Sequence, residues 1–381
     1  MRILYVLENY YPNLGGVETL FKSIAEGFAE QGHHVKIVTT HLFPETARYE
    51  RQGNLEIVRM PLRNRYLFTF FSLFFILPHV RGCDVIHTTS YNAGLPAFIA
   101  AKLFRKKVII TFHEVWADLW FKLPWMGKIS SRLHYLFEQM LVRLPFDRFV
   151  AVSQSTAAAL ERAGVAEHRI RMIYDGIDYR AFERRPRLPR KNESPFLFTY
   201  FGRLGISKGL ELLIPAFADV HERHPLTRLQ LIVPTVPEPF LADLKKLVQN
   251  HGVSTTTQFR HELSFLELQA AIRASDAVVI PSWSEGFCFA AVETVALGTP
   301  IVSSGRTALR ETVTGHYVEM NAQTIEGLRD AMERAYRGEW EHRPIRYFHL
   351  QQTIEAYFRL YRELGSSSTR SVRRSANSTS S

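Results

Sequence analysis

The chain has 381 residues, of which 46% are hydrophobic and 22% are charged, and its formal net charge is +10. This composition excludes a wholly disordered chain, and the length exceeds the single core of a domain of roughly 100 to 200 residues, so two domains are expected. The two cysteines, Cys83 and Cys288, lie far apart in sequence and form no CxxC pair. We therefore expect no structural zinc site and a reducing, cytoplasmic setting.

The positive charge is concentrated in the front half of the chain. Residues 1–190 carry 26 basic and 17 acidic side chains, whereas residues 191–381 carry 21 and 20. A run of arginines in residues 180–190 would suit a solvated linker, but the front half stays basic without it. This surplus favours an anionic partner, either a membrane surface or a phosphate-bearing substrate. No recognition-helix, zinc-finger or RNP pattern is present, so nucleic acid is not expected as a partner.

Short apolar runs alternate with helical patterns along the first half. The run at 2–7 is predicted to be a strand and not a signal peptide, because Glu8 interrupts it and no small-residue cleavage pattern follows. A turn with Gly15 and Gly16 leads into a helix that ends near Gly32. Later strand candidates are VKIVTT, LEIVRM, DVIHTTS, KVIITFHE and RFVAVS. This alternation predicts a parallel sheet with helices on both faces and ligands at the carboxyl ends of the strands.

A second series of strands and helices follows the basic, proline-containing stretch at 181–195. Its strand candidates are FLFTYFG, RLQLIVP, TTQFRH, DAVVIPS and TPIVSS. One large doubly wound sheet is the alternative, but the break favours two similar domains, at 1–188 and 195–344. Residues 365–381 have almost nothing apolar to bury and are predicted to be disordered.

Two loops combine glycine with residues that suit an anion. Gly15 and Gly16 stand between a predicted strand and helix, where they allow close backbone approach to a bound group, but the pattern is not GxGxxG and disfavours a dinucleotide. Arg203 and Lys208, in FGRLGISKG, also follow a strand and precede a helix. Two cations there suit a diphosphate, and a pair of solvated loop charges is the alternative.

The stretch EGFCFAAVE places two carboxylates at the start of another predicted helix. Glu285 precedes the helix, and Glu293 lies about one turn inside it. A helix cap and an exposed helical glutamate would explain each singly. They do not explain why both occur beside Gly286, in a loop expected to face the same crevice as the two cations.

Taken together, these motifs resemble the retaining family 4 glycosyltransferases with the GT-B fold. The resemblance covers nearly all of residues 1–363, and it is carried by the motifs GG at 15–16, TFHE, VSQS, IYDGID, GRLGISKG, PSWSEGFCFAAVE and ALGTPIV. It implies an α/β fold with two Rossmann-like domains whose parallel sheets face a central cleft. It also implies that a helix at 345–364, which carries an apolar stripe, crosses back and packs on the N-terminal domain.

The resemblance also implies roles for the site residues. Glu285 would face the donor sugar, with His113 near the reacting sugar, and these two are the candidate catalytic residues; for His113 a satisfied polar residue at a strand end is the alternative. Glu293 would accept hydrogen bonds from the ribose of a nucleotide sugar. The remaining donor-binding candidates contact the diphosphate or sugar: Gly15, Gly16, Arg203, Lys208 and the backbone amides of Phe287, Cys288 and Phe289.

Some positions depart from the family pattern. Cys288 and Asp175 stand where glycine and asparagine are usual, VPTVPEP replaces a glycine-rich turn, and GRTALRE lacks a frequent Gly-Gly. No DxD-like pair is present in the expected loop, and a fixed cation pair can replace a metal ion. We therefore predict no metal and no cofactor, with a nucleotide-diphosphate sugar as co-substrate.

The acceptor is suggested by an apolar segment at 67–77. It is too short to span a bilayer, which takes about 20 apolar residues. A buried core helix is one interpretation, and a helix that dips into a membrane face beside Arg63, Arg65 and Arg81 is the other. A second aromatic and basic segment, at 116–143, also suits a headgroup interface.

With the basic front half, these segments favour a lipid-linked or cell-envelope glycan acceptor. They also favour a cytoplasmic protein that is peripheral on the inner face of the membrane. The alternatives are a soluble transferase for a small sugar or sugar phosphate and a catalytically inactive nucleotide-sugar-binding scaffold.

Overall fold

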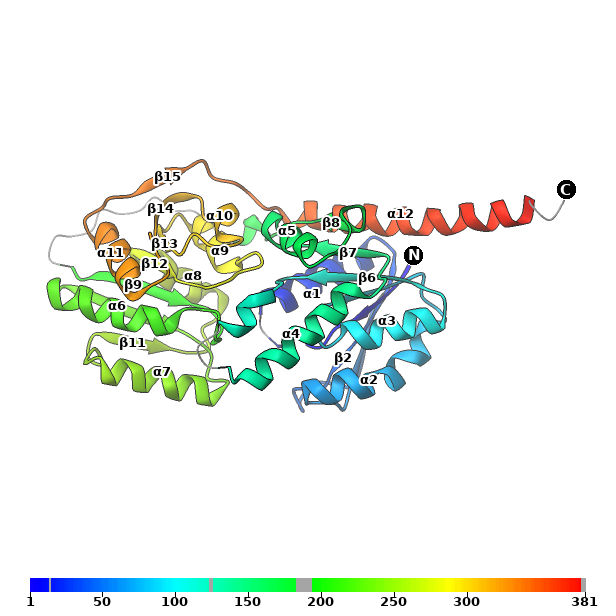
Figure 1. Cartoon of the computed structure of the whole chain (residues 1–381), viewed down its shortest axis with the longest axis horizontal. Coiled ribbons are helices and arrows are strands. Elements are labelled where there is room, and N and C mark those ends of the chain that lie inside the picture. The colour runs from blue at the N-terminus through cyan, green and yellow to red at the C-terminus, as the bar shows by residue number, and fades with distance from the viewer. Residues whose placement is uncertain (14, 123–125, 183–193, 378–381) are drawn as a thin grey trace. The chain divides into compact units, whose positions relative to one another are not determined.

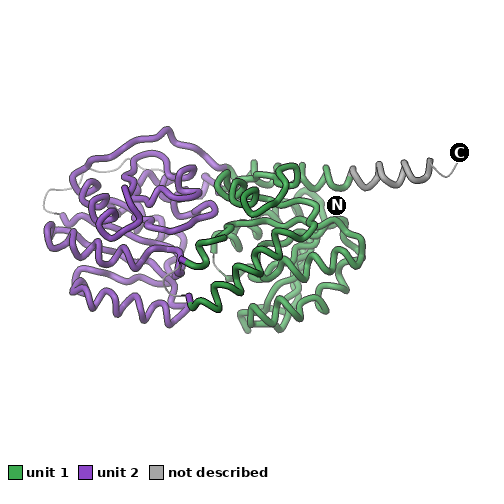
Figure 2. The backbone as a smooth tube through the Cα atoms, in the orientation of Figure 1, with its two compact units in different colours: residues 1–121, 127–176, 349–381 green, residues 122–126, 177–348 purple. Residues whose placement is uncertain are grey.

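The computed structural model describes residues 1–13, 15–122, 126–182 and 194–377, with side chains described as far as Gly365. Two compact units are present (Figure 2): unit 1 comprises Met1–Phe121, Gly127–Gly176 and His349–Ser381, and unit 2 comprises Lys122–Met126 and Ile177–Phe348. Each unit has its own sheet, so the alternative of one large sheet is wrong. The break expected between 188 and 195 falls mostly on residues 183–193, outside the described residues, and the chain changes unit earlier, after Gly176.

Unit 1 is built on an eight-stranded sheet with the order β3-β4-β2-β1-β5-β6-β7-β8 (Figure 1). All neighbouring strands are parallel except β3 and β4. The strands are β1 (Arg2–Val6), β2 (His34–Thr40), β3 (Tyr49–Gln52), β4 (Leu55–Met60), β5 (Val85–Thr89), β6 (Lys107–Phe112), β7 (Arg148–Ala151) and β8 (Ile170–Met172).

Helices cover both faces of this sheet, because successive strand residues point to opposite sides. Leu4 and Val6 join a core cluster with residues of α2 to α5, whereas Tyr5 contacts Phe21 of α1 and Tyr361 of α12 on the other side. The helices are α1 (Gly16–Glu30), α2 (Arg65–Val80), α3 (Gly94–Leu103), η1 (Ala117–Phe121), α4 (Lys128–Arg143), α5 (Gln154–Arg162), η2 (Glu167–Arg169) and α12 (Leu350–Asn377), with η1 and η2 being 3-10 turns.

Unit 2 contains a seven-stranded sheet with the order β11-β10-β9-β12-β13-β14-β15. All neighbours are parallel except β14 and β15. The strands are β9 (Phe196–Phe201), β10 (Thr227–Ile232), β11 (Thr257–Arg260), β12 (Ala277–Ile280), β13 (Ile301–Ser303), β14 (Gly315–Glu319) and β15 (Glu341–Arg343). Val279 and Val278 of β12 belong to different core clusters, so the strand is buried on both faces.

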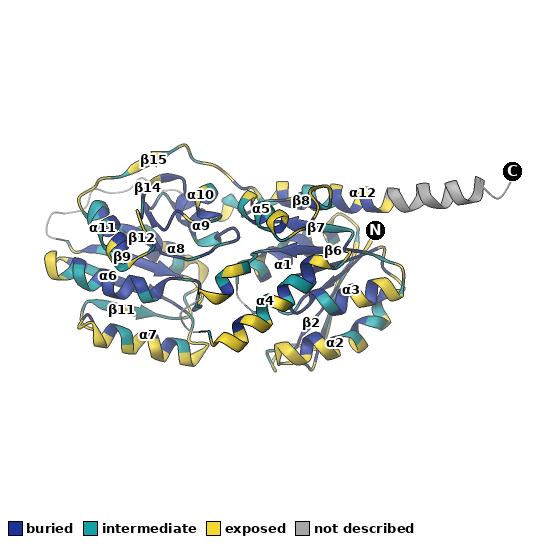
Figure 3. Cartoon of the chain, viewed as in Figure 1, coloured by how far each residue is buried: buried dark blue, intermediate teal, exposed yellow. Residues whose placement is uncertain are grey.

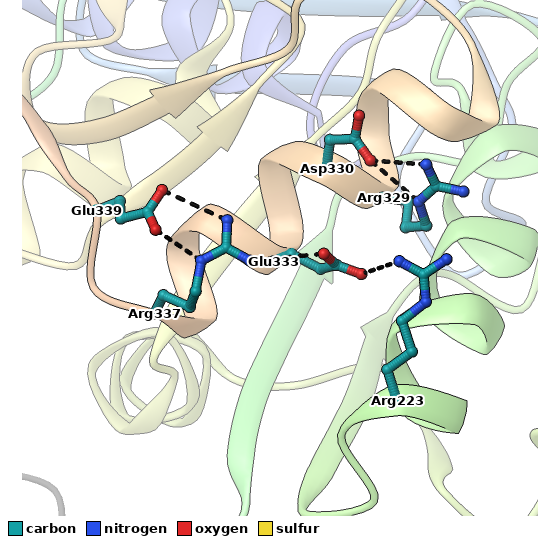
Figure 4. A network of polar contacts seen from close by, with 6 residues as sticks. All are labelled: Arg223, Arg329, Asp330, Glu333, Arg337 and Glu339. Carbon is teal, nitrogen blue, oxygen red and sulfur yellow. Dashed lines mark hydrogen bonds and ion pairs between the residues drawn. The ribbon is translucent and has the colours of Figure 1, made fainter.

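The helices of unit 2 are η3 (Tyr179–Ala181), α6 (Leu210–Arg223), α7 (Glu238–Asn250), α8 (Phe265–Ala274), α9 (Phe289–Leu297), α10 (Leu309–Thr312) and α11 (Ile325–Tyr336). Figure 4 shows a polar network where α6 meets α11. Arg223 donates to Glu333 at 2.6 Å, and Arg337 lies between Glu333 and Glu339. Exposed pairs of this kind contribute at most about 1 kcal/mol each, so the apolar packing beneath them holds the two helices together.

The C-terminal helix differs from its sequence prediction at both ends. A helix was expected at 345–364, but α12 begins at Leu350, because Ile345 and Phe348 pack within unit 2. A disordered tail was expected from Gly365, whereas α12 continues to Asn377; the last four residues lie outside the described chain. One glycine costs a helix only about 1 kcal/mol, and no proline follows it.

The junction between the two units requires a glycine. A Cβ on Gly176 would lie 2.7 Å from the backbone of His349 and Leu350, where the returning chain passes.

Within the described residues, no helix is both long and apolar enough to span a bilayer.

Candidate functional site

In unit 2 the proposed donor-binding residues lie where strands end and helices begin. The loop after β9 contains Arg203 and Lys208 and ends at Gly209, which has a φ of 72°. A Cβ at Gly209 would lie 2.1 Å from the carbonyl oxygen of Pro281, so only glycine allows this loop to approach the loop after β12 so closely. The backbone N–H of Trp283 also donates to the carbonyl of Ser207 at 2.8 Å, which ties the two loops together.

This approach brings Lys208 and Glu285 into contact. The Nζ atom of Lys208 lies 2.8 Å and 3.0 Å from the two carboxylate oxygens of Glu285, and the side chains are 19% and 10% exposed. Ser282 donates a third hydrogen bond to the same carboxylate, at 2.7 Å. The sequence predicted that these groups lie near each other. It did not indicate that Lys208, the predicted diphosphate-binding cation, pairs with the carboxylate of Glu285.

Glu285 is also held through its backbone. Its N–H donates to Oγ1 of Thr307 at 2.9 Å, and its carbonyl accepts from the N–H of Ala308 at 3.3 Å. Both partners belong to the segment GRTALRE, which the sequence singled out only because a glycine pair was missing. Sequence reasoning therefore missed Ser282 and Thr307, since no local pattern marks a residue that supports a distant loop.

The helix α9 begins shortly after Glu285. Phe287 and Cys288 are buried, and Phe289 is the first helical residue. Cys288 takes a left-handed conformation with a φ of 71°, the kind of position glycine fills without strain; a side chain there costs about 1–2 kcal/mol. The first N–H groups of a helix have no partner in the helix, so those at the start of α9 can face an anion.

Glu293 lies farther along α9 without an ion-pair partner among the described residues. Burial raises the pKa of its carboxyl group from an ordinary value near 4.5 to about 7. Such a group gains most from a ligand that donates hydrogen bonds to its ionised form. Arg203, in contrast, is exposed, and within the described residues its guanidinium makes no ion pair.

In unit 1 the glycine pair begins α1. Gly15 is the N-cap residue in an extended conformation, and Gly16 is the first residue of the helix. The buried carboxylate of Glu18 folds back against this turn and accepts from Nδ2 of Asn13 at 3.1 Å. A Cβ on Gly15 would lie 2.2 Å from an oxygen of Glu18, so the turn has no room for a larger residue unless Glu18 moves.

His113 directly follows β6 and contacts Asp175. Its Nδ1 lies 3.4 Å from Oδ2 of Asp175, longer than an ordinary hydrogen bond, and the Asp175 side chain is fully buried. No hydrogen bond of either Asp175 oxygen, or of Nε2 of His113, is present in the described chain. Burial raises the pKa of the Asp175 carboxyl group, and His113 partly offsets this. Nε2 of His113 is itself buried, so this contact leaves buried polar atoms unsatisfied on both side chains.

A buried polar chain lies behind His113. Nδ1 of His87 forms a hydrogen bond with the hydroxyl of Tyr361 at 2.5 Å, and its Nε2 forms one with the hydroxyl of Thr111 at 2.7 Å. The hydroxyl of Thr111 also lies 3.1 Å from that of Tyr357. Burial lowers the pKa of His87 to about 3, so this histidine is neutral. Two tyrosines of α12 thus support the strand that ends at His113, and no sequence signal indicated them.

The predicted site residues therefore form two groups. Those of unit 2 lie in the loops after β9 and β12 and on α9; those of unit 1 lie at the start of α1 and after β6. No group of three or more histidine, cysteine, aspartate or glutamate side chains is arranged to hold a metal ion in the part of the chain that the structure describes.

Two Rossmann-like units with polar residues after their parallel strands define a GT-B protein. The sequence matches Glycosyltransferase Family 4 over residues 14–180 and Glycosyl transferases group 1 over residues 182–346. The chain belongs to this family of glycosyltransferases.

The curated relatives are distant. Glycogen synthase of Mycobacterium tuberculosis is 29% identical over 230 residues, which are 60% of this chain and 54% of that protein, so the chain spans about half of its length. The alpha-monoglucosyldiacylglycerol synthase of Streptococcus pneumoniae is 24% identical, and the match covers 82% of this chain and 73% of that protein. The GDP-mannose:cellobiosyl-diphosphopolyprenol alpha-mannosyltransferase of Xanthomonas campestris is 25% identical, with 87% of each chain covered.

Solved structures show the same fold. Sucrose-phosphate synthase from Thermosynechococcus elongatus superposes with a TM-score of 0.74 at 20% identity, over 99% of this chain and 100% of that one. The Anabaena protein HepE, in complex with UDP and glucose, gives 0.67 at 16% identity, over 95% and 100%.

Proposed function

We propose that this chain transfers a hexosyl group, with retention of configuration, from a nucleotide-diphosphate sugar to a lipid-linked or cell-envelope glycan acceptor. The observation that carries the transfer reaction is the contact between Lys208 and Glu285 beside the start of α9. It pairs a cation with a carboxylate shortly before α9, whose first N–H groups have no partner in the helix. That combination suits a sugar joined to a diphosphate.

On this proposal the donor is held mainly by unit 2. Arg203, Lys208 and the amides of residues 287–289 bind the diphosphate, and Glu293 accepts from the ribose. Negative charge grows on the leaving diphosphate during transfer, so fixed cations and helix donors stabilise the transition state more than the ground state. The fold shared with HepE, whose structure contains UDP and glucose, supports this type of donor.

Glu285 and His113 would act closest to the sugar. Glu285 is neutralised by Lys208, so it can face the sugar without repelling the diphosphate. On this proposal, donor binding brings the sugar or acceptor to the buried Nε2 of His113, and the backbone of Gly15 and Gly16 approaches the diphosphate once the Glu18 carboxylate moves away from the start of α1. We further propose that no metal ion takes part, because Arg203 and Lys208 supply the positive charge that the diphosphate requires.

The lipid-linked acceptor is favoured by the surface of unit 1. Several aromatic side chains of α2 are exposed, beside the basic residues expected from the sequence. Figure 3 shows exposed positions along this helix. The names of two relatives include a lipid: alpha-monoglucosyldiacylglycerol synthase and GDP-mannose:cellobiosyl-diphosphopolyprenol alpha-mannosyltransferase. We therefore propose a cytoplasmic protein that is peripheral on the inner face of the membrane.

The test begins with a nucleotide-sugar binding screen on the purified full chain, by calorimetry. The bound donor is then incubated with a lipid-phosphate acceptor in vesicles and, separately, with water-soluble sugars and sugar phosphates. An α-linked product from an α-linked donor, formed on the lipid acceptor and in the presence of EDTA, is expected.

Other results would overturn parts of the proposal. Transfer only to soluble sugars would replace the lipid acceptor by a small one. Donor binding without transfer or donor hydrolysis would indicate an inactive scaffold. Activity that is lost in EDTA and restored by magnesium or manganese would contradict metal independence.

A further inference from the structure

The helix α2 carries a continuous stripe of exposed apolar side chains. Two rows with a spacing of four residues lie side by side on one helix face. Phe70 and Phe74 are each 70% exposed, more than most aromatic side chains of a folded protein. The full stripe consists of Tyr66, Leu67, Phe70, Phe71, Phe74 and Phe75.

The other face of α2 is fixed in the core. Phe68 and Ile76 are fully buried, as is Ser72, and all three lie against the sheet side of the helix. Asn64 caps the helix by accepting from the N–H groups of Tyr66 and Leu67. The interpretation of this segment as a core helix therefore holds for one face of α2. The other face is exposed and has no partner within the described chain. Exposed apolar clusters of this size mark interaction surfaces.

Exposed apolar side chains also occur on two other helices of unit 1. Leu103 at the end of α3 is 63% exposed, and α3 packs beside α2. Ile129, Leu133 and Leu136 of α4 are also exposed, and α2, α3 and α4 all pack on the same face of the sheet (Figure 3). The apolar side chains thus lie on three helices of one layer.

The arginines at both ends of α2 give its border a positive charge, which Glu8 offsets only at Arg65. The helix contains no acidic residue; Arg63 and Arg65 stand at its start, and Arg81 follows its end. Arg81 stacks on the ring of Phe104, and Lys102 on that of Phe98, where α2 and α3 meet. An anionic surface complements this border. A second copy of the chain would set arginines against arginines, with no carboxylate on α2 to pair them.

We propose that α2 lies flat in the headgroup layer of an anionic bilayer, with Phe70 and Phe74 among the acyl chains and the bordering arginines at the lipid phosphates. At 16 residues, α2 is about 24 Å long, which suits a helix that lies in the interface and does not cross it.

The start of α2 connects this surface to the acceptor side of unit 1. Nε of Arg65 lies 3.4 Å from Glu8, which follows β1, and Glu8 also accepts from Nδ2 of Asn92 at 2.7 Å. Glu8 and His113 follow parallel strands, so they lie at the same edge of the sheet. Membrane docking deepens the proposed function, because it would bring a lipid-held acceptor to that edge; only this link rests on the proposed function.

The experiment is co-sedimentation of the full chain with vesicles of phosphatidylcholine alone and of phosphatidylcholine mixed with phosphatidylglycerol, at low and high salt. Phe70→Ser/Phe74→Ser removes the insertion and Arg63→Ser/Arg81→Ser removes the charge. The matched controls lie in unit 2: Leu266→Ser, at an apolar side chain 72% exposed, and Lys246→Ser, at an exposed lysine. Circular dichroism verifies the fold of each variant.

Binding to the mixed vesicles alone is expected, weakened by salt because the Debye length falls from about 10 Å at 0.1 M to about 3 Å at 1 M. Each α2 double variant should bind at least about tenfold more weakly, since several small contributions act together, whereas the controls should match the wild type. Absence of wild-type binding, or equal binding by Phe70→Ser/Phe74→Ser and Leu266→Ser, would overturn the proposal. A dimer that only Phe70→Ser/Phe74→Ser abolishes, without vesicle binding, would assign the surface to a second copy.

Nucleotide-sugar binding is measured on the same samples. Vesicle binding without donor binding would leave the docking surface standing and remove the proposed function. Donor binding without vesicle binding would remove the docking surface and leave nucleotide-sugar binding standing.

Discussion

The ammonium group of Lys208 lies 2.8 Å from the carboxylate of Glu285, and the two side chains come from loops that follow different strands of unit 2. Both are largely buried, so each supplies the charge that makes the burial of the other tolerable. On the proposed function, a diphosphate would meet a lysine already held in position, which would reduce the loss of side-chain freedom on binding.

Lys208→Met and Glu285→Gln should each destabilise the protein, because each leaves an unpaired, partly buried charge or polar group. We expect about 1–3 kcal/mol for each single variant and clearly less than the sum for the double variant. Urea unfolding of the four proteins measures the coupling. Additivity within about 0.5 kcal/mol would mean that the contact contributes nothing to stability.

Arg203→Ala and Glu293→Ala should each weaken nucleotide-sugar binding. On the proposed function, the first variant loses half of the diphosphate clamp, and the second loses the carboxylate that accepts from the ribose. A lost hydrogen bond to a charged group costs about 1.5–3 kcal/mol, which is roughly tenfold to a hundredfold in affinity. Calorimetry on each variant provides the measurement, with Lys246→Ala as the control. Wild-type affinity in both variants, with the fold intact, would remove the site assignment.

Donor affinity should rise between about pH 6 and pH 8. The pKa of Glu293 is raised to about 7 by burial, and ribose hydroxyls donate to its ionised form, so binding releases a proton in this range. The same raised pKa has the opposite effect on the stability of the free protein, which falls as the pH rises. The stability that it contributes is complete below about pH 4.5 and is lost as pH rises through about 7.

Glu293→Gln is the control for this pH dependence, because it cannot ionise. Its donor affinity should be lower and flat with pH. Calorimetry in buffers of different ionisation enthalpy counts the released protons. A wild-type affinity that falls from pH 6 to pH 8, or one as flat as that of the variant, would contradict the prediction.

Asp175→Asn should stabilise the protein increasingly as pH rises. Burial raises the pKa of the Asp175 carboxyl group, so the stability it contributes is present near and below its ordinary pKa of 3.8 and is lost at higher pH. Asparagine has nearly the same shape and no charge to bury. Melting temperatures of both proteins across about pH 4 to 8 test this. If asparagine is the less stable residue at pH 8, the contact with His113 outweighs the burial of the charge.

Truncation after residue 344 should destabilise unit 1. It removes Tyr357 and Tyr361, both fully buried, and leaves Tyr5 and Nδ1 of His87 without their hydrogen-bond partner Tyr361. Truncation after Leu364 keeps every one of these contacts. Differential scanning calorimetry should show a markedly lower melting temperature for the shorter protein alone. Equal melting temperatures for the full chain and the shorter protein would refute the role given to α12.

The sequence by itself determined the architecture and the chemistry of the loops. Alternating apolar runs such as RILYV and AVVI indicated buried parallel strands, because a strand covered on both faces has no polar side. The motifs around Arg203, Lys208, Glu285 and Glu293 were sufficient to indicate the family, since they combine glycine turns with charges at strand ends. Short edge strands escaped detection. Both β3 and β15 are mostly polar and pair antiparallel at the margins of their sheets, so they carry no buried pattern.

Only the tertiary structure decided which of these residues touch. The contacts of Lys208 with Glu285 and of His113 with Asp175 join residues 77 and 62 positions apart, and helical or strand periodicity has no information over such distances. The same holds for α2. Its apolar run suits a buried helix and a membrane-facing helix equally well, and the outcome depends on how much of its surface the neighbouring sheet and helices cover. That coverage leaves Phe70 and Phe74 exposed while Phe68 and Ile76 are buried, because one face of a helix is all that a single sheet can bury.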